Sequence, residues 1–204
     1  MQSFPTLLNG YGRVPPGKIA SVVTCLEMTE RPPRKTLRPR ERPLVMAPWP
    51  DPDLAEYRAL FRRIGEDWLW FSRLVMPDDE LVAIVRDPRV ELFVLEDMGK
   101  AIGLVELDFR EEGACELAFF GVVAEEIGRG AGRFLMDEAT ARAWAKPIRR
   151  FWVHTCTFDH PAALGFYRRS GFRPYAFLVE IADDPRLAGH LSRDACPQVP
   201  LIEG

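Results

Sequence analysis

The stretch from residue 114 to residue 134, ACELAFFGVVAEEIGRGAGRF, most constrains the fold of this 204-residue chain. An apolar strand-like run reaches Val123, and an acidic turn then leads to Gly128, Gly130 and Gly132 before a helical pattern begins. A glycine turn between a strand and a helix is typical of an anion site, because free N–H groups and the helix dipole favour negative charge. Glycine also tolerates positive φ and lets a ligand approach the backbone. The sequence therefore predicts a phosphate-binding turn.

Hydrophobic periodicity around this turn predicts a mixed α+β domain. About six strands and about four helices follow in the order β-α-α-β-β-β-α-β-α-β. Tight turns join the three central strands into an antiparallel meander, and a strand reached through a helix is expected to lie parallel to its predecessor. The predicted strands lie at residues 44–47, 90–95, 101–109, 114–123, 151–157 and 172–181, and the helices at about 53–65, 77–86, 130–145 and 160–170.

The same pattern places one domain at residues 44–182, with an irregular N-terminal extension at 1–43 and an irregular tail at 183–204. The first 27 residues show no clear period, and the next 16 are rich in proline and arginine, a composition that does not bury a core. Met28 is a candidate for the natural start, on the hypothesis that the preceding segment is read through from an upstream start.

Composition narrows the function classes. A net charge of −3 does not favour a nucleic-acid partner, and no apolar run reaches membrane-spanning length. The four cysteines, Cys25, Cys115, Cys156 and Cys196, have no zinc-ligand spacing, so we expect reduced thiols and no metal. The sequence thus predicts a cytoplasmic protein with no membrane partner. It leaves the oligomeric state open, with a homodimer as one option.

Two phosphate-binding motifs do not fit the glycine turn. A P-loop needs Lys followed by Ser or Thr after its last glycine, and Arg133-Phe134 stands there instead. A dinucleotide fingerprint needs G-x-G-x-x-G in a βαβ unit, but Arg133 occupies the third glycine position and the preceding strand belongs to a meander.

A third pattern, Q/R-x-x-G-x-G/A, matches residues 127–132 except at its first position, Ile127. A second one, N-x-x-A-x-x-φ-Y-x-x-x-G-F, falls on residues 160–172, with His160 in place of Asn and matches at Ala163, Tyr167, Gly171 and Phe172. With both motifs in this order, residues 44–182 resemble the GNAT superfamily of acetyl-CoA-dependent N-acyltransferases. The resemblance implies a central, mostly antiparallel sheet with one splayed parallel strand pair.

The resemblance also implies acetyl-CoA as co-substrate. The glycine turn would hold its pyrophosphate through backbone N–H groups, and Arg129 or Arg133 would replace the side-chain contact that Ile127 lacks. The pantetheine arm would pair with the end of the preceding strand, where a backbone N–H near Phe120 would stabilise the oxyanion. The expected cofactor-binding residues are Val122, Val123, Gly128, Arg129, Gly130, Ala131, Gly132, Arg133, Phe134 and His160.

Two residues are predicted to be catalytic. The resemblance places the phenol of Tyr167 near the CoA sulfur, where it would donate a proton; a tyrosine packed under the sheet is the alternative. Glu116 is the candidate base, since burial can raise a glutamate pKa toward neutrality, although a surface carboxylate is the simpler interpretation. Strand alternation puts Glu116 and Phe120 on one face. Glu106 lies on the neighbouring strand, and Asp159 is more typical of a helix cap.

Aromatic residues are predicted to cover the acceptor. In similar proteins the connection between the first two helices covers the acceptor site, and here it carries Trp68, Trp70 and Phe71. Such a wall suits an apolar or cationic ligand, with core packing as the alternative. His154 would line the pocket or lie satisfied in the core. We therefore expect transfer of an acetyl group to a primary amine of a small molecule or peptide; the alternative is a catalytically silent acyl-CoA-binding or interaction module.

Overall fold

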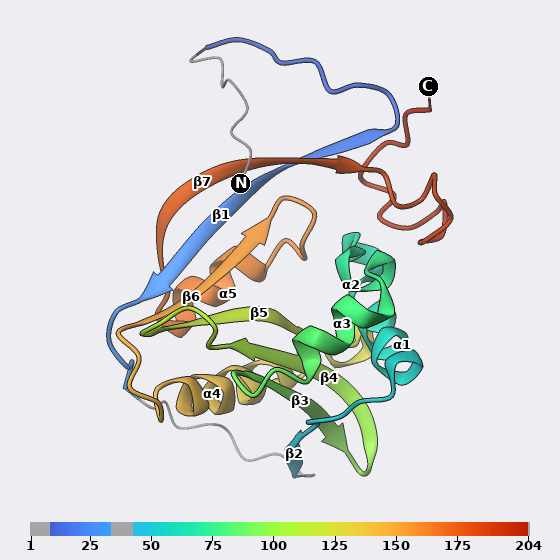
Figure 1. Ribbon diagram of the computed structural model, residues 1–204. Helices are drawn as coiled ribbons and strands as arrows, with labels where there is room; N and C mark the ends of the chain where they lie inside the picture. The colour runs from blue at the N-terminus through green and yellow to red at the C-terminus, as the bar shows by residue number, and fades with distance from the viewer. Residues whose placement is uncertain (1–8, 34–42, 204) are drawn as a thin grey trace.

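The computed structural model describes residues 9–33 and 43–203 (Figure 1). Parts of the predicted N-terminal extension, residues 1–8 and 34–42, lie outside the described residues. The described chain forms one seven-stranded sheet with the order β2-β3-β4-β5-β6-β1-β7. The strands are β1 (Lys18–Met28), β2 (Leu44–Pro48), β3 (Val90–Asp97), β4 (Lys100–Asp108), β5 (Ala114–Val122), β6 (Arg150–Cys156) and β7 (Arg173–Asp183).

Only the β5–β6 pair is parallel, and every other neighbouring pair in this sheet is antiparallel. The predicted α+β class with a mostly antiparallel sheet is therefore confirmed. Helices α1, α2 and α3 lie over one face of the sheet, and α4 and α5 lie over the other (Figure 1). The helices are α1 (Leu54–Gly65), α2 (Ser72–Val75), α3 (Asp78–Val85), α4 (Ala131–Ala143) and α5 (Ala163–Ser170).

Helix α1 forms where its sequence pattern predicts. The Asp53 side chain accepts hydrogen bonds from the backbone N–H groups of Ala55 and Glu56, which caps the helix. Its apolar stripe, including Tyr57 and Phe61, is buried against the sheet. The one-turn helix α2, which follows the aromatic segment, was not predicted from the sequence.

The N-terminal extension is not irregular throughout, because residues 18–28 form β1. This strand lies between β6 and β7 and pairs with both over much of its length (Figure 1). Its buried positions include Ser21 and Thr24 as well as apolar residues, so the alternation of apolar and polar residues is weak. Because of this weak alternation the sequence pattern did not predict the strand. The sheet therefore has seven strands rather than about six. A chain beginning at Met28 would keep only the last residue of β1.

Among residues 184–203 the C-terminal tail has no helix or strand, but it is packed. Leu191, Ala195 and Cys196 are buried in a second apolar cluster with Ile19 of β1 and Leu69 of the α1–α2 connection. Two hydrogen bonds add to this packing: Arg62 donates to the carbonyl of His190, and the Ser192 N–H donates to the Glu66 carboxylate. The tail therefore supports the connection between α1 and α2.

Candidate active site

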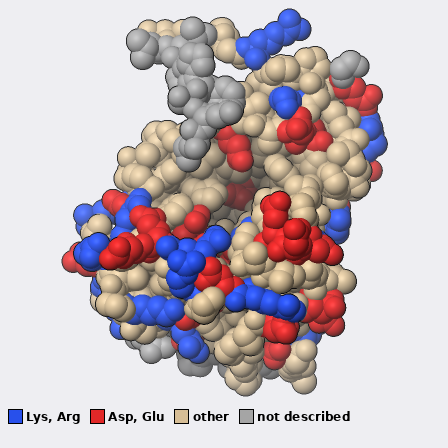
Figure 2. Space-filling model, in the orientation of Figure 1, with Lys and Arg blue, Asp and Glu red and all other residues tan. Residues whose placement is uncertain are grey.

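The parallel strands β5 and β6 separate soon after they begin. They pair only from Ala114 to Glu116 on β5 and from Arg150 to Trp152 on β6. A cavity of about 670 Å³ opens beyond that point, lined by both strands, the glycine turn, α5, β1, β7 and the α1–α2 connection. Figure 2 shows this face hollowed at its centre, with acidic atoms inside the hollow. The splayed pair predicted from the motifs is thus present.

The backbone of β5 points into the gap at two residues. Val123 donates its N–H to the carbonyl of Ile102 over 2.9 Å, so its backbone faces β4 and is not available for a pantetheine arm. Backbone groups alternate in direction along an antiparallel ladder. From the register of β4 and β5, the N–H and C=O of Val122 and of Phe120 therefore face the β6 side, where pairing has ended.

The glycine turn leaves backbone donors without helical hydrogen-bond partners at the start of α4. Gly128 and Gly130 adopt φ of 79° and 88°, a region that favours glycine. The first helical bond runs from the Phe134 N–H to the Gly130 carbonyl, so the N–H groups of residues 131–133 precede it, and no side chain caps them. A Cβ placed at Gly128 would meet no atom within 4 Å. The turn therefore has donors and open space for an anion.

The arginines near this turn are balanced by acids. Arg133 lines the cavity and donates from Nε to Asp137 over 3.1 Å. Arg129 is an exposed side chain whose guanidinium lies 4.0 Å from Glu126. Ile127 is 39% exposed and offers no polar group. Of the two arginines, Arg133 is better placed to meet a ligand in the cavity.

Tyr167 projects from α5 to the cavity wall. Its ring is packed edge-on against Phe120, Phe166 and Phe172, and only 8% of the residue is exposed. Within the described residues its hydroxyl has no hydrogen-bond partner. Burial, with a smaller contribution from the charge of Asp159, raises the pKa of Tyr167 above its usual value. The phenol therefore stays protonated and available as a donor.

Glu116 and His154 face each other across β5 and β6. The Glu116 carboxylate lies 3.5 Å from Nδ1 of His154, whose side chain is half exposed in the cavity. A hydrogen bond and the charge of Glu116 raise the pKa of His154. The structure therefore brings the predicted base together with the predicted pocket histidine.

One face assignment from the sequence is wrong. A β-bulge interrupts the β4–β5 register, since Leu107 opposes Leu117 while Glu106 opposes Phe119. The extra residue shifts the alternation, so Phe120 packs on the α5 side against Phe166, whereas Glu116 faces His154. Glu116 and Phe120 therefore line the cavity from opposite faces of the sheet.

Glu106 is engaged elsewhere and does not line the cavity. It is fully buried, accepts from Arg73 of α2 over 2.5 Å and accepts from the Tyr57 hydroxyl over 3.2 Å. The Arg73 guanidinium also lies over the ring of Phe119, 4.9 Å from its centroid. This buried ion pair ties α2 to β4. It argues for a structural role of Glu106 rather than a base.

The predicted aromatic wall, Trp68, Trp70 and Phe71, contains residues that pack in the core and residues that line the cavity. Trp70 packs against Phe61 and Phe119 and donates its Nε1–H to Asp159 over 3.0 Å. It fits because Gly65 has no side chain: a Cβ there would lie 2.3 Å from the Cβ of Trp70. Trp68 and Phe71 line the cavity beside it, and the Trp68 ring packs against His160 at 5.0 Å. Packing and pocket-lining interpretations therefore both apply to this segment.

Asp159 and His160 stabilise the chain just before α5. Asp159 accepts from the Thr155 hydroxyl, the Cys156 N–H and Trp70, so it does not cap α5. Nδ1 of His160 accepts from the Ala162 N–H over 3.0 Å, and its ring lines the cavity. Both residues thus link the aromatic wall to the end of β6.

Several polar residues of the cavity were not predicted from the sequence, and two of them lie on neighbouring strands. Ser21 of β1 and Glu180 of β7 are directly opposite each other in the β1–β7 register, and both line the cavity. Each is a polar residue within an otherwise largely apolar strand, which was the available signal. Because residues 1–43 were predicted to be irregular, no partner strand was available to place them.

Other features bear on the class of site. In the described residues no group of three His, Cys, Asp or Glu is arranged to hold a metal ion. All four cysteines are free, and burial raises the pKa of Cys115, Cys156 and Cys196. None of the helices in the described part of the chain has the length and apolar character needed to cross a membrane.

Comparison with solved structures shows where this fold recurs. A GCN5-related N-acetyltransferase from Sphaerobacter thermophilus is 19% identical with a TM-score of 0.58, over 80% of this chain and 52% of that one. A protein of unknown function from Staphylococcus epidermidis is 16% identical with a TM-score of 0.53, over 82% and 63%. The chain thus spans about half to two thirds of the length of these two structures.

An aminoglycoside acetyltransferase from an uncultured soil metagenomic sample, in complex with trehalose, is 19% identical with a TM-score of 0.51, over 63% of this chain and 87% of that one. No curated protein matches the sequence. The model of the acetyltransferase (GNAT) family matches residues 40–172, which include the glycine turn and Tyr167. The chain therefore belongs to the acetyltransferase (GNAT) family.

Proposed function

We propose that the protein is an N-acetyltransferase that moves the acetyl group of acetyl-CoA directly to a primary amine. The observation that carries the proposal is the convergence of three features on one cavity. These are the open N–H groups after Gly130, the phenol of Tyr167 and the Glu116–His154 pair. Family membership supports acetyl transfer, and the acceptor is the part that the family leaves open.

The binding half of this proposal uses the backbone. The N–H groups of residues 131–133 would receive the pyrophosphate, where the α4 dipole adds to the attraction. The pantetheine arm would then run along β5 toward Phe120 and Val122, whose backbone groups face the gap. The N–H of Phe120 would stabilise the oxyanion that forms on the thioester carbonyl.

The chemistry follows from the two walls of the cavity. The amine nitrogen attacks the thioester carbon, and its proton passes to the Glu116–His154 pair, directly or through water. The C–N bond forms, the C–S bond breaks, and the leaving thiolate takes a hydrogen bond and proton from Tyr167. The high pKa of Tyr167 ensures that this proton is present at neutral pH.

Thiol release measures this reaction. Purified protein is incubated with acetyl-CoA and separate classes of amine: aliphatic monoamines, diamines, amino acids, aminoglycosides and peptides. We expect free CoA thiol to form only when an amine is present and the acetylated amine to appear in equal amount. Binding of acetyl-CoA without thiol release from any class would overturn the proposal and favour a silent acyl-CoA-binding module.

A further inference from the structure

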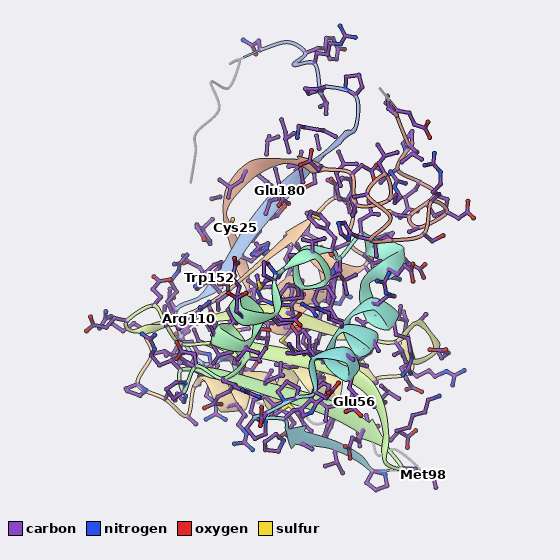
Figure 3. The ribbon with its side chains drawn as sticks, turned by 45° about the vertical axis from the view of Figure 1, so that its right-hand side comes forward. Cys25, Glu56, Met98, Arg110, Trp152 and Glu180 are labelled. Atoms are coloured by element: carbon purple, nitrogen blue, oxygen red, sulfur yellow. The ribbon has the colours of Figure 1, made fainter. Side chains whose placement is uncertain are left out.

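The acceptor part of the cavity is bounded by two carboxylates on different strands. Glu116 lies on β5 and Glu180 on β7, and β6 and β1 lie between them. Both residues line the cavity, and the charge of Glu180 acts on His154, which faces Glu116. Glu180 lies near the top of this sheet, above Cys25 and Trp152 (Figure 3).

Glu180 is accompanied by a buried hydroxyl. Ser21 is its direct neighbour on β1 and is only 3% exposed. Its Oγ lies beside the Cys156 thiol but has no hydrogen-bond partner of normal geometry. An unpaired buried hydroxyl costs free energy, about 1–3 kcal/mol in typical cases, unless a ligand supplies a partner. Glu180 itself has no ion pair or hydrogen bond within the described residues.

The cations around the cavity do not neutralise the carboxylates of its acceptor part. Arg73 is paired with Glu106 and Arg110 with Asp108, and Arg133 is paired with Asp137 at the glycine turn. The group near Glu180 that can carry a positive charge is His154. The charges of Glu116, Asp159 and Glu180 all raise its pKa. The acceptor part therefore has more carboxylates than cations among the described residues.

We propose that the amine acceptor carries a second cationic group and that Glu180, with Ser21 beside it, binds that group. This inference rests on the proposed transferase function and specifies its substrate class, a short aliphatic diamine. One nitrogen reacts beside Glu116 and His154, while the other stays protonated, pairs with the Glu180 carboxylate and donates to the Ser21 hydroxyl. The rings of Trp68 and Phe71 would cover the apolar spacer between the nitrogens.

The reaction leaves the second nitrogen unchanged. The acetyl carbon bonds to the first nitrogen, the C–S bond of acetyl-CoA breaks, and the proton released from that nitrogen passes to the Glu116–His154 pair. Glu180 touches the substrate and exchanges no proton. Its contribution is binding and orientation, so it affects the selectivity between diamines and monoamines.

The test compares 1,4-diaminobutane with n-butylamine, which has the same carbon chain and one amine. Glu180 is exposed, so we expect wild-type kcat/KM to favour the diamine by about fivefold, the upper range for one added charge pair at an exposed carboxylate. In Glu180→Gln the ratio should fall to about one. Asp183→Asn removes a charge from the same strand outside the cavity, where the side chain is 87% exposed, and should keep the wild-type ratio.

A wild-type ratio near one, or an unchanged ratio in Glu180→Gln, would overturn the inference while leaving acetyl transfer intact. If no amine yields CoA thiol, the proposed function fails, and calorimetry of the two amines with CoA present still decides the inference. Tighter binding of 1,4-diaminobutane than of n-butylamine, lost in Glu180→Gln, supports it. Equal binding overturns it.

Discussion

The two halves of the cavity are built in different ways. The proposed cofactor half comes from one short stretch, in which β5, the glycine turn and the start of α4 follow one another along the chain. The acceptor half combines β1, the α1–α2 connection, β6 and β7, and the C-terminal tail packs behind it. Ser21 and Glu180 are direct neighbours although most of the chain separates them. A local site tolerates change elsewhere, whereas an assembled one depends on the whole sheet.

This difference predicts where mutations act. Changes in the glycine turn should remove cofactor binding and leave the fold intact, because the turn projects into open space at Gly128. Changes that support the acceptor half should lower stability as well, because the Arg73–Glu106 pair and the hydrogen bonds of Asp159 belong to packed elements.

Deletion of residues 1–27 should have the largest effect. It removes nearly all of β1 and leaves β6 and β7 without the strand between them. We expect loss of cooperative thermal unfolding by circular dichroism. A chain beginning at Gly12, ahead of β1, is the control and should unfold like the full chain. A cooperative transition at the wild-type midpoint in the chain that begins at Met28 would contradict this expectation and favour Met28 as the start.

Arg73→Met should be the most damaging single substitution among those considered. It leaves the buried Glu106 carboxylate without its partner, which costs about 3–5 kcal/mol of unfolding free energy by the usual behaviour of broken buried pairs. Urea unfolding measures the loss. Arg86→Met, which breaks the exposed pair with Asp51, should cost less than about 1 kcal/mol. Similar losses in the two variants would contradict a structural role for the buried pair.

The same contrast between local and long-range features separates the elements that the sequence predicted from those that it did not. Tyr57 and Phe61 of α1, the glycine turn and the Tyr167 motif are local patterns, and each lies where it was predicted. The missing features are long-range. Strand β1 was missed because Ser21 occupies a buried position, and its pairing with Glu180 could not be known without β1.

The bulge beside Phe119 is another long-range feature that the sequence did not predict. A bulge depends on how two strands fit each other, so period-2 reasoning on β5 alone assigned Phe120 to the wrong face. The packing of the C-terminal tail against Leu69 depends on side chains far away in the chain, so the sequence pattern of the tail did not predict it. The residue types of the local motifs indicated the class of reaction, whereas the contacts between distant parts of the chain could be known only from the fold.

Tyr167→Phe should act on turnover rather than on folding. Removing the phenolic proton should lower kcat about 100-fold, the scale of general acid catalysis, with little change in acetyl-CoA affinity. Thiol release and calorimetry measure the two quantities separately. Tyr175→Phe, on β7 outside the cavity, is the matched control. An unchanged kcat in Tyr167→Phe would remove Tyr167 from the mechanism.

Glu116→Gln should produce the smallest effect, mainly on pH dependence. Glu116 raises the pKa of His154, so His154 stays protonated to a higher pH and the neutral form that accepts a proton appears only above that pKa. Loss of Glu116 lowers this pKa toward its ordinary value of about 6.5. The acidic limb of kcat/KM should therefore move to lower pH. Glu112→Gln, in an exposed hairpin turn, should not move it.

The most direct measurement of the central claim is thermal unfolding with acetyl-CoA in wild type, Gly130→Asp and Gly99→Asp. Gly130 and Gly99 both adopt positive φ, at 88° and 77°, but Gly99 lies in the turn between β3 and β4. At a ligand concentration of about 100 times Kd, wild type and Gly99→Asp should gain about 2.7 kcal/mol, and Gly130→Asp should gain nothing. No gain in wild type, or an equal gain in Gly130→Asp, would contradict an acetyl-CoA site at the glycine turn.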